Sequence, residues 1–258
     1  MRPRVQKQED TVVDELKTLE NLAAKDVAIV ASWGPMAHAV TRHPCGAVIS
    51  AGRTGGASRD AFRVNRRASE ILRESSVAAA YPGWGDYRPD RFAAALALHY
   101  LREVAPRLLV VGLGDTDEYG HRGNYEKYVE SLQRFDAFLG DLFRSLEHMR
   151  NRGGRTASVF VLTDHGRDAG FAHHGSGDPS SSRVWVLAHG PRIVGPARRA
   201  GRANPMSLGD LAPTLRTAFG LTTHGEGEGE GEGEAKKRER MRDQADRERW
   251  LKMEKPRG

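Results

Sequence analysis

Two short polar segments, each directly after an apolar run, carry side chains that could bind a metal. The first, "DTDEYGH" (115–121), follows "RLLVVGL" (107–113) and places Asp117 and His121 four residues apart. That spacing lets one helical turn or one tight loop direct both side chains to a single point. Carboxylate oxygen and imidazole nitrogen together suit zinc, manganese or iron. A turn alone would need only a glycine or an asparagine.

The second polar segment, "DHGRD", follows the apolar run "VFVLT" and contributes Asp164 and His165. The glycine-rich stretch "FAHHGSG" comes next and offers His173 and His174. A single histidine at a strand end is usually structural. Several Asp and His side chains at equivalent places, in a chain whose one cysteine is Cys45, instead predict a metal site without thiolate ligands.

Alternating apolar and helical patterns predict the elements that must position these side chains. Strand-like runs cover residues 26–32, 45–52, 107–113, 157–163 and 183–190, and we expect 107–113 and 157–163 to be buried. Apolar residues at helical spacing cover 88–104, 124–149 and 207–221. This order predicts a layered α/β/α fold with a mainly parallel central sheet. Both polar segments then lie at the carboxyl ends of strands, where such sheets bind ligands.

Composition excludes several other classes of protein. The chain has 258 residues with 38% hydrophobic and 29% charged residues, which indicates a globular protein with a sizeable core. No apolar stretch approaches the roughly 20 residues of a membrane span. The first residues lack the apolar region of a signal peptide, so a cytoplasmic location is the default, with export expected if the true N-terminus is missing. The net charge of +6 is scattered, without the aromatic-interleaved basic stripe of nucleic-acid binders.

The C-terminal part differs from the rest of the chain. Residues 225–234 repeat Gly-Glu and predict a low-complexity linker, and residues 235–258 hold ten Lys and Arg against five Asp and Glu. We therefore expect a folded, metal-binding domain over 1–224, the linker, and a charged basic tail. The tail is interpreted as a solvated segment, and docking to an acidic partner is the alternative.

Three ordered groups of motifs carry a resemblance to a known family. They are "GDTDEYGH" with "NYEKYVESLQRFDAFLGDL", then "TDHGR" with "HHGS" and "RVWVLAHGP", and finally "LGDLAPTLRTAFGL". Together, over residues 105–221, they resemble the C-terminal portion of the alkaline phosphatase superfamily. That superfamily includes phosphatases, phosphodiesterases, sulfatases and cofactor-independent phosphoglycerate mutases. The resemblance implies an alkaline phosphatase-like fold and a metal-dependent hydrolase of phosphate or sulfate esters, with a small-molecule ester as its partner.

The resemblance also implies which residues bind metal. Members of the superfamily hold two cations about 4 Å apart, a separation suited to in-line displacement. By resemblance, Asp117 and His121 ligate the first metal together with His174, with His173 as the alternative. Asp164 and His165 ligate the second. The donor types imply Zn²⁺, with Mn²⁺ as the other choice.

The family's nucleophile is not found in this sequence. Members carry, near the N-terminus, an aspartate at the end of the first strand and a Ser or Thr at the following helix start. Before "DVAIVAS" this chain has a charged, helix-like segment instead, so we expect the fold to be N-terminally incomplete. Enzymatic activity therefore stays open, and we expect slow turnover or none from this chain alone. A catalytically inactive metal-binding remnant or a truncated gene product is the alternative.

Two further side chains near these motifs have two interpretations each. Asp115 could orient a metal ligand or only bind the amides of its own loop. Arg167 could contact a phosphoryl or sulfuryl oxygen, or form a surface salt bridge. The sequence does not distinguish a phosphatase from a phosphodiesterase or a sulfatase, nor does it give the oligomeric state.

Overall fold

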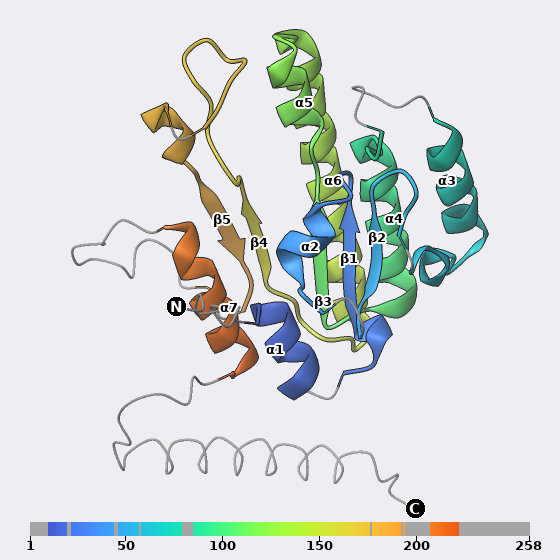
Figure 1. Ribbon diagram of the computed structural model, residues 1–258. Helices are drawn as coiled ribbons and strands as arrows, with labels where there is room; N and C mark the ends of the chain where they lie inside the picture. Colours follow the sequence, from blue (N-terminus) through green and yellow to red (C-terminus); the bar gives the residue numbers. More distant parts are fainter. Residues whose placement is uncertain are drawn as a thin grey trace, which may run out of the picture. The chain divides into compact units, whose positions relative to one another are not determined.

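The computed structural model of the protein describes residues 10–19, 22–43, 46–56, 58–78, 85–175, 177–191, 193 and 207–221 (Figure 1). The helices are α1 (Val12–Leu19), α2 (Met36–Val40), α3 (Arg66–Val77), α4 (Asp90–Val104), α5 (Asp115–His121), α6 (Tyr125–Asn151) and α7 (Leu211–Phe219). The strands are β1 (Val27–Ala31), β2 (Val48–Ala51), β3 (Leu108–Gly112), β4 (Val159–Leu162) and β5 (Val186–His189). Short 3-10 turns cover Ala24–Asp26, Arg59–Phe62, Pro179–Ser182 and Leu208–Asp210.

The predicted linker 225–234 and tail 235–258 lie outside the described residues, so the three-part division of the chain stays a prediction. None of the helices in the described ranges is long and apolar enough to cross a bilayer.

Strand β1 is the centre of a parallel sheet with the order β2-β1-β3. Ile29 lies opposite Ile49 on one side and Val110 on the other. Side chains of β1 alternate between two cores, because successive residues of a strand point to opposite faces. Ala28 and Val30 pack in a core built from α3, α4 and α6, and the other three pack with α1 and α2. The predicted α/β/α layering and the parallel sheet are confirmed.

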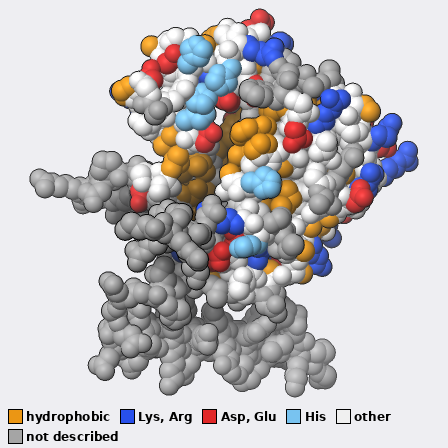
Figure 2. Space-filling view, viewed as in Figure 1, with side chains coloured by type: hydrophobic (Ala, Val, Ile, Leu, Met, Phe, Trp, Pro, Cys, Tyr) orange, Lys and Arg blue, Asp and Glu red, His pale blue; other side chains and the backbone are white. Residues whose placement is uncertain are grey.

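Strands β4 and β5 form a separate antiparallel pair, which the sequence did not predict. The expected burial of β3 and β4 is wrong, because all five residues of β3 are half-buried and only Val161 of β4 is buried. The reason is that, among the described strands, β3 pairs only with β1 and β4 only with β5. Figure 2 shows hydrophobic side chains on both sides of a hollow beside these strands. Strands β3 and β4 thus each keep one backbone edge without a strand partner in the described part of the chain.

A buried arginine crosses the carboxyl ends of β1 and β2. Arg88 is fully buried, and its guanidinium donates to the carbonyl oxygens of Ala31 (2.9 Å) and Ser50 (2.5 Å) and to the Ser50 hydroxyl (2.9 Å). A buried charge is tolerated only when hydrogen bonds replace its hydration. These bonds fix the segment before α4 across the sheet edge where the polar motifs lie.

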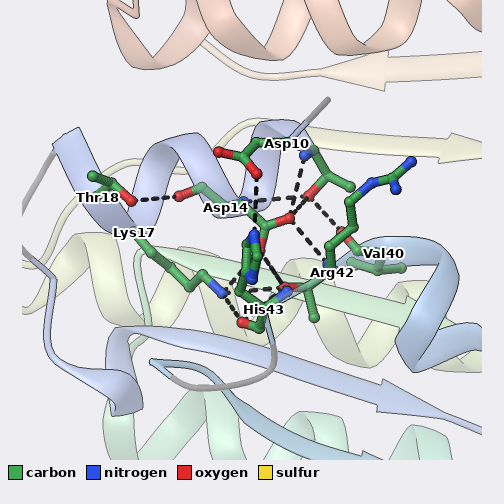
Figure 3. A network of polar contacts seen from close by, with 9 residues as sticks. Asp10, Asp14, Lys17, Thr18, Val40, Arg42 and His43 are labelled. Carbon is green, nitrogen blue, oxygen red and sulfur yellow. Dashed lines mark hydrogen bonds and ion pairs between the residues drawn. The ribbon is translucent and has the colours of Figure 1, made fainter. Parts of the chain in front are cut away.

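Helix α1 is held by a second buried charge, Asp14 (Figure 3). Its carboxylate accepts from the Thr11 hydroxyl (2.7 Å), the Thr41 hydroxyl (2.5 Å) and the Arg42 N–H (3.0 Å), and Lys17 lies 3.0 Å away. Burial alone would raise the pKa of Asp14. The hydrogen bonds from Thr41, Arg42, Thr11 and Lys17 outweigh it and hold that pKa well below its usual value. The charged carboxylate therefore stabilises the turn that follows α2.

We expect Asp14→Asn to lower the free energy of unfolding at pH 7 by about 2 kcal/mol, because an amide cannot accept all of these bonds. The lowered pKa of Asp14 means that its stabilisation is present above about pH 4, the usual value, and is lost as the pH falls below it. Urea unfolding at pH 7 and pH 3 should therefore show a difference between wild type and variant that shrinks at pH 3.

The matched control is Asp10→Asn. Asp10 lies beside the same network but its side chain is exposed. In Figure 3 its carboxylate is joined to the exposed His43 ring, 3.1 Å away. This change should alter the unfolding free energy by no more than about 0.5 kcal/mol. Equal losses in the two variants would contradict the role given to Asp14.

Candidate metal centre

Helix α5 begins three residues after β3 and carries two of the predicted ligands. Asp117 and His121 lie one turn apart on it, with Oδ2 of Asp117 3.4 Å from Nε2 of His121. The predicted convergence of this pair is therefore present. Both side chains are about one-third exposed, at 35% and 38%, so a ligand can reach them from solvent.

The loop after β4 brings His174 to the same point. Its Nε2 lies 3.0 Å from Nε2 of His121 and 3.5 Å from Oδ1 of Asp117. The three potential ligand atoms lie within 4.8 Å of one another. Gly175 follows with φ +142°, a backbone conformation that favours glycine and lets the loop turn immediately after His174.

His165 lies at the border of this group. Its Nε2 is 3.6 Å from Oδ1 of Asp117, and its ring stacks on that of His174 with centroids 3.7 Å apart. Nδ1 of His165 lies 3.0 Å from the Gly166 carbonyl, which can only accept, so Nδ1 carries the proton. A neutral ring with this tautomer would present the lone pair of Nε2, as in metal-binding histidines.

Two of the predicted or alternative ligands lie outside the group. Asp164 is 86% exposed; its Oδ1 accepts from the N–H of His165 at 3.0 Å, and its Oδ2 lies 3.6 Å from Nε2 of His165. The backbone of His173 pairs with Asp168, its N–H donating to the carboxylate at 3.2 Å and its carbonyl accepting at 3.0 Å. The structure therefore brings together Asp117, His121 and His174, with His165 beside them. Assignment of Asp164 and His165 to a second metal stays a prediction.

Arg167 is the positive charge nearest to the candidate ligands. It forms an ion pair with the Asp117 carboxylate, and donates to the Asp117 carbonyl at 2.6 Å and the Phe171 carbonyl at 3.1 Å. A Cβ at Gly120 would lie 2.4 Å from the centre of the guanidinium, so only glycine leaves room for this arrangement. The Arg167 side chain is 13% exposed, so its ion pair with Asp117 is not a fully solvated surface salt bridge.

The environment favours a neutral imidazole at His174. Burial lowers its pKa, and the neighbouring His165 lowers it further, against the opposing effect of Asp117. A neutral imidazole is the form that binds a cation. Figure 2 shows histidine and acidic side chains gathered at one end of the molecule, over the loop after β4. One carboxylate and two or three imidazoles fit a zinc- or manganese-type ion by number and type of donor.

Asp90, which the sequence analysis missed, supports the start of α5 together with Asp115. Asp115 is buried, and its Oδ1 accepts from the Tyr87 hydroxyl (2.7 Å) and the Asp90 N–H (3.2 Å). Burial and the nearby Asp115 charge raise the pKa of Asp90 to about 7, while hydrogen bonds from Ser32, Gly114 and Asp115 oppose the rise. The only sequence signal was an acidic residue directly after Arg88-Pro89 at a predicted helix start. The contact between residues 90 and 115 could not be read from spacing.

Comparison with known proteins finds one matching family profile and several similar mutases. The family profile described as "Metalloenzyme: Metalloenzyme superfamily" matches residues 88–223. A phosphopentomutase from Desulfitobacterium hafniense is 29% identical over 163 residues, which cover 61% of this chain and 39% of the relative. A 2,3-bisphosphoglycerate-independent phosphoglycerate mutase from Synechococcus sp. is 29% identical over 161 residues, covering 58% and 28%.

A phosphopentomutase from Carboxydothermus hydrogenoformans is 34% identical over 116 residues, covering 44% of this chain and 26% of the relative. The chain thus spans about two-fifths or less of the length of these relatives. No solved structure matches it significantly. The matched region contains α4, β3, α5, α6 and all the candidate ligands, and on this evidence the chain belongs to the alkaline phosphatase-like Metalloenzyme superfamily.

Proposed function

We propose that this chain carries the metal-binding part of a site for metal-dependent phosphoryl transfer on a small phosphate ester, with a phosphosugar as the substrate class. The observation that carries the proposal is the convergence of Asp117, His121 and His174 at the carboxyl ends of β3 and β4. The family supplies the expectation of a divalent metal. Zinc is the proposed ion from the donor types, and manganese the alternative.

The side chains divide into two roles around such a centre. Asp117, His121 and His174 would hold the cation, with His165 adjoining them, and a bound divalent cation would supply Lewis acidity at a phosphoryl oxygen. Arg167, held beside Asp117, offers a planar fork of N–H donors that matches phosphate oxygens. No nucleophile is assigned to any residue.

Phosphoryl transfer within a sugar is preferred here over ester hydrolysis. The relatives named above are mutases, whereas the sequence motifs alone suggested a hydrolase of phosphate or sulfate esters. Mutase and hydrolase differ in where the phosphoryl group goes, to another position of the sugar or to water. Phosphodiesterase and sulfatase activities receive no support from these relatives.

A metal-binding domain without catalysis is the second candidate. It is favoured by the 86% exposure of the Asp164 side chain, which keeps only one described contact toward the candidate ligands, 3.6 Å from its Oδ2 to Nε2 of His165. Catalytic zinc sites typically use three protein ligands. Asp164 and His165 would supply two, so we expect a second metal to bind weakly if it binds at all.

We expect the protein to bind at least one Zn²⁺ or Mn²⁺ per chain, and His121→Ala to lose most of it, because one of three ligands in the group is removed. Elemental analysis after dialysis measures the content. His173→Ala is the matched control, since His173 follows the same strand on the same loop but lies outside the group. Equal metal content in wild type and His121→Ala would contradict the centre.

We also expect Mn²⁺-loaded protein to broaden the ³¹P NMR signal of a phosphopentose far more than the same Mn²⁺ with His121→Ala, because the paramagnetic ion would then lie beside the phosphate. The spectra also report the reaction: a new sugar phosphate signal indicates transfer, and inorganic phosphate indicates hydrolysis. Broadening without any new signal would favour the non-catalytic candidate. No protein-dependent broadening would contradict the proposed function.

A further inference from the structure

Two carboxylates at neighbouring helix starts, one of them two residues before Asp117, are not among the candidate ligands. Asp90 is the first residue of α4 and Asp115 the first residue of α5. Two acidic groups held near each other in a buried place are costly unless hydrogen bonds compensate them. Their hydrogen bonds show what they do here.

Each carboxylate binds the start of the other helix. Oδ1 of Asp90 accepts from the N–H of Gly114 at 2.8 Å, and its Oδ2 accepts from the N–H of Asp115 at 2.9 Å. In return, Oδ1 of Asp115 accepts from the N–H of Asp90 at 3.2 Å. The first N–H groups of a helix have no partner within the helix, so these contacts satisfy donors that would otherwise be unpaired.

The two carboxylates, Asp90 and Asp115, also accept hydrogen bonds from side chains beside the sheet. The hydroxyl of Ser32, the fully buried residue that follows β1, donates to Oδ1 of Asp90 at 2.5 Å. The Tyr87 hydroxyl donates to Asp115 at 2.7 Å, and Tyr87 is itself almost completely buried. The turn between β3 and α5 is therefore fixed from two elements, β1 and the segment before α4, that carry none of the candidate ligands.

The position of this turn sets the position of the ligands. Helix α5 has seven residues, with Asp117 two and His121 six residues after Asp115. Helix α5 packs against α6 along its length, and its start is fixed by the hydrogen bonds to Asp90. Functional side chains must be held within about 0.5 Å of their working geometry.

We propose that Asp90 is a positioning residue of the metal centre, which holds the start of α5 so that Asp117 and His121 meet His174. The proposal rests on the proposed function only in that these three residues bind a metal. Asp90 itself touches no ligand atom in the contacts described above, and its effect passes through the backbone of Gly114 and Asp115.

The test is Asp90→Asn, in which one oxygen becomes an amide donor and faces a backbone N–H instead of accepting from it. Isothermal titration with Zn²⁺ should show affinity reduced about tenfold, the lower part of the range for residues that orient metal ligands. Co²⁺ in place of Zn²⁺ should show a changed visible absorption spectrum, because the ligand geometry differs.

The matched control is Asp14→Asn, which changes an equally hydrogen-bonded carboxylate on α1, at the other end of β1 from α5 (Figure 1). That variant should lose stability yet keep the Zn²⁺ affinity within about twofold and the Co²⁺ spectrum unchanged. A fall in affinity and a changed spectrum with Asp90→Asn only would support positioning rather than general loosening of the fold.

Ser32→Ala is the second variant, in case Asp90→Asn does not fold. It removes one donor to the same carboxylate and should lower Zn²⁺ affinity in the same direction by a smaller factor. Unchanged affinity in a folded Asp90→Asn, or in Ser32→Ala if the former does not fold, would overturn the positioning role while leaving the metal centre intact. A wild type that binds no metal would overturn both this role and the proposed function.

Discussion

The complete burial of β1 is the constraint on which the other features depend. Its five residues are at most 1% exposed, with parallel neighbours on both edges and a separate core on each face. A parallel sheet of this kind is stable only when helices cover both faces. Because both faces are covered by helices, polar side chains can gather at the edge of the sheet formed by the carboxyl ends of the strands. Arg88, Ser32 and Asp90 all act at that edge, and α5 starts from it.

The sequence was informative where the deciding contacts are local. Periodic apolar residues indicated α4 and α6, and apolar runs indicated β1 to β3, because these elements bury their own patterned faces. The pairing of Asp117 with His121 followed from a four-residue separation on one element. His174 lies 53 residues after His121. Spacing alone could not choose it over His173, and the choice came from the family pattern.

Other features could not be predicted because they depend on what lies alongside a segment. The residues of β3 and β4 are apolar enough for full burial, yet their burial also requires a neighbour on each edge, which sequence does not specify. The antiparallel pairing of β4 with β5 is a further case. Asp90 resembles an ordinary acidic residue in a first helical turn, and only the folded chain shows that its partner is the start of a different helix.

The ion pair between Arg167 and Asp117 also fixes the electrical balance of the centre. The charges of Arg167 and Asp117 cancel, and imidazoles must be neutral to serve as ligands. Asp117, Arg167 and the ligand histidines would therefore carry no net charge among themselves. A divalent ion would add two positive charges next to Arg167. Asp117 would then be shared between the ion and Arg167. The resulting positive charge would favour a bound phosphate-type anion. The bound cation would raise the protein's affinity for the anion, and the anion would raise its affinity for the cation by the same factor, as thermodynamic reciprocity requires.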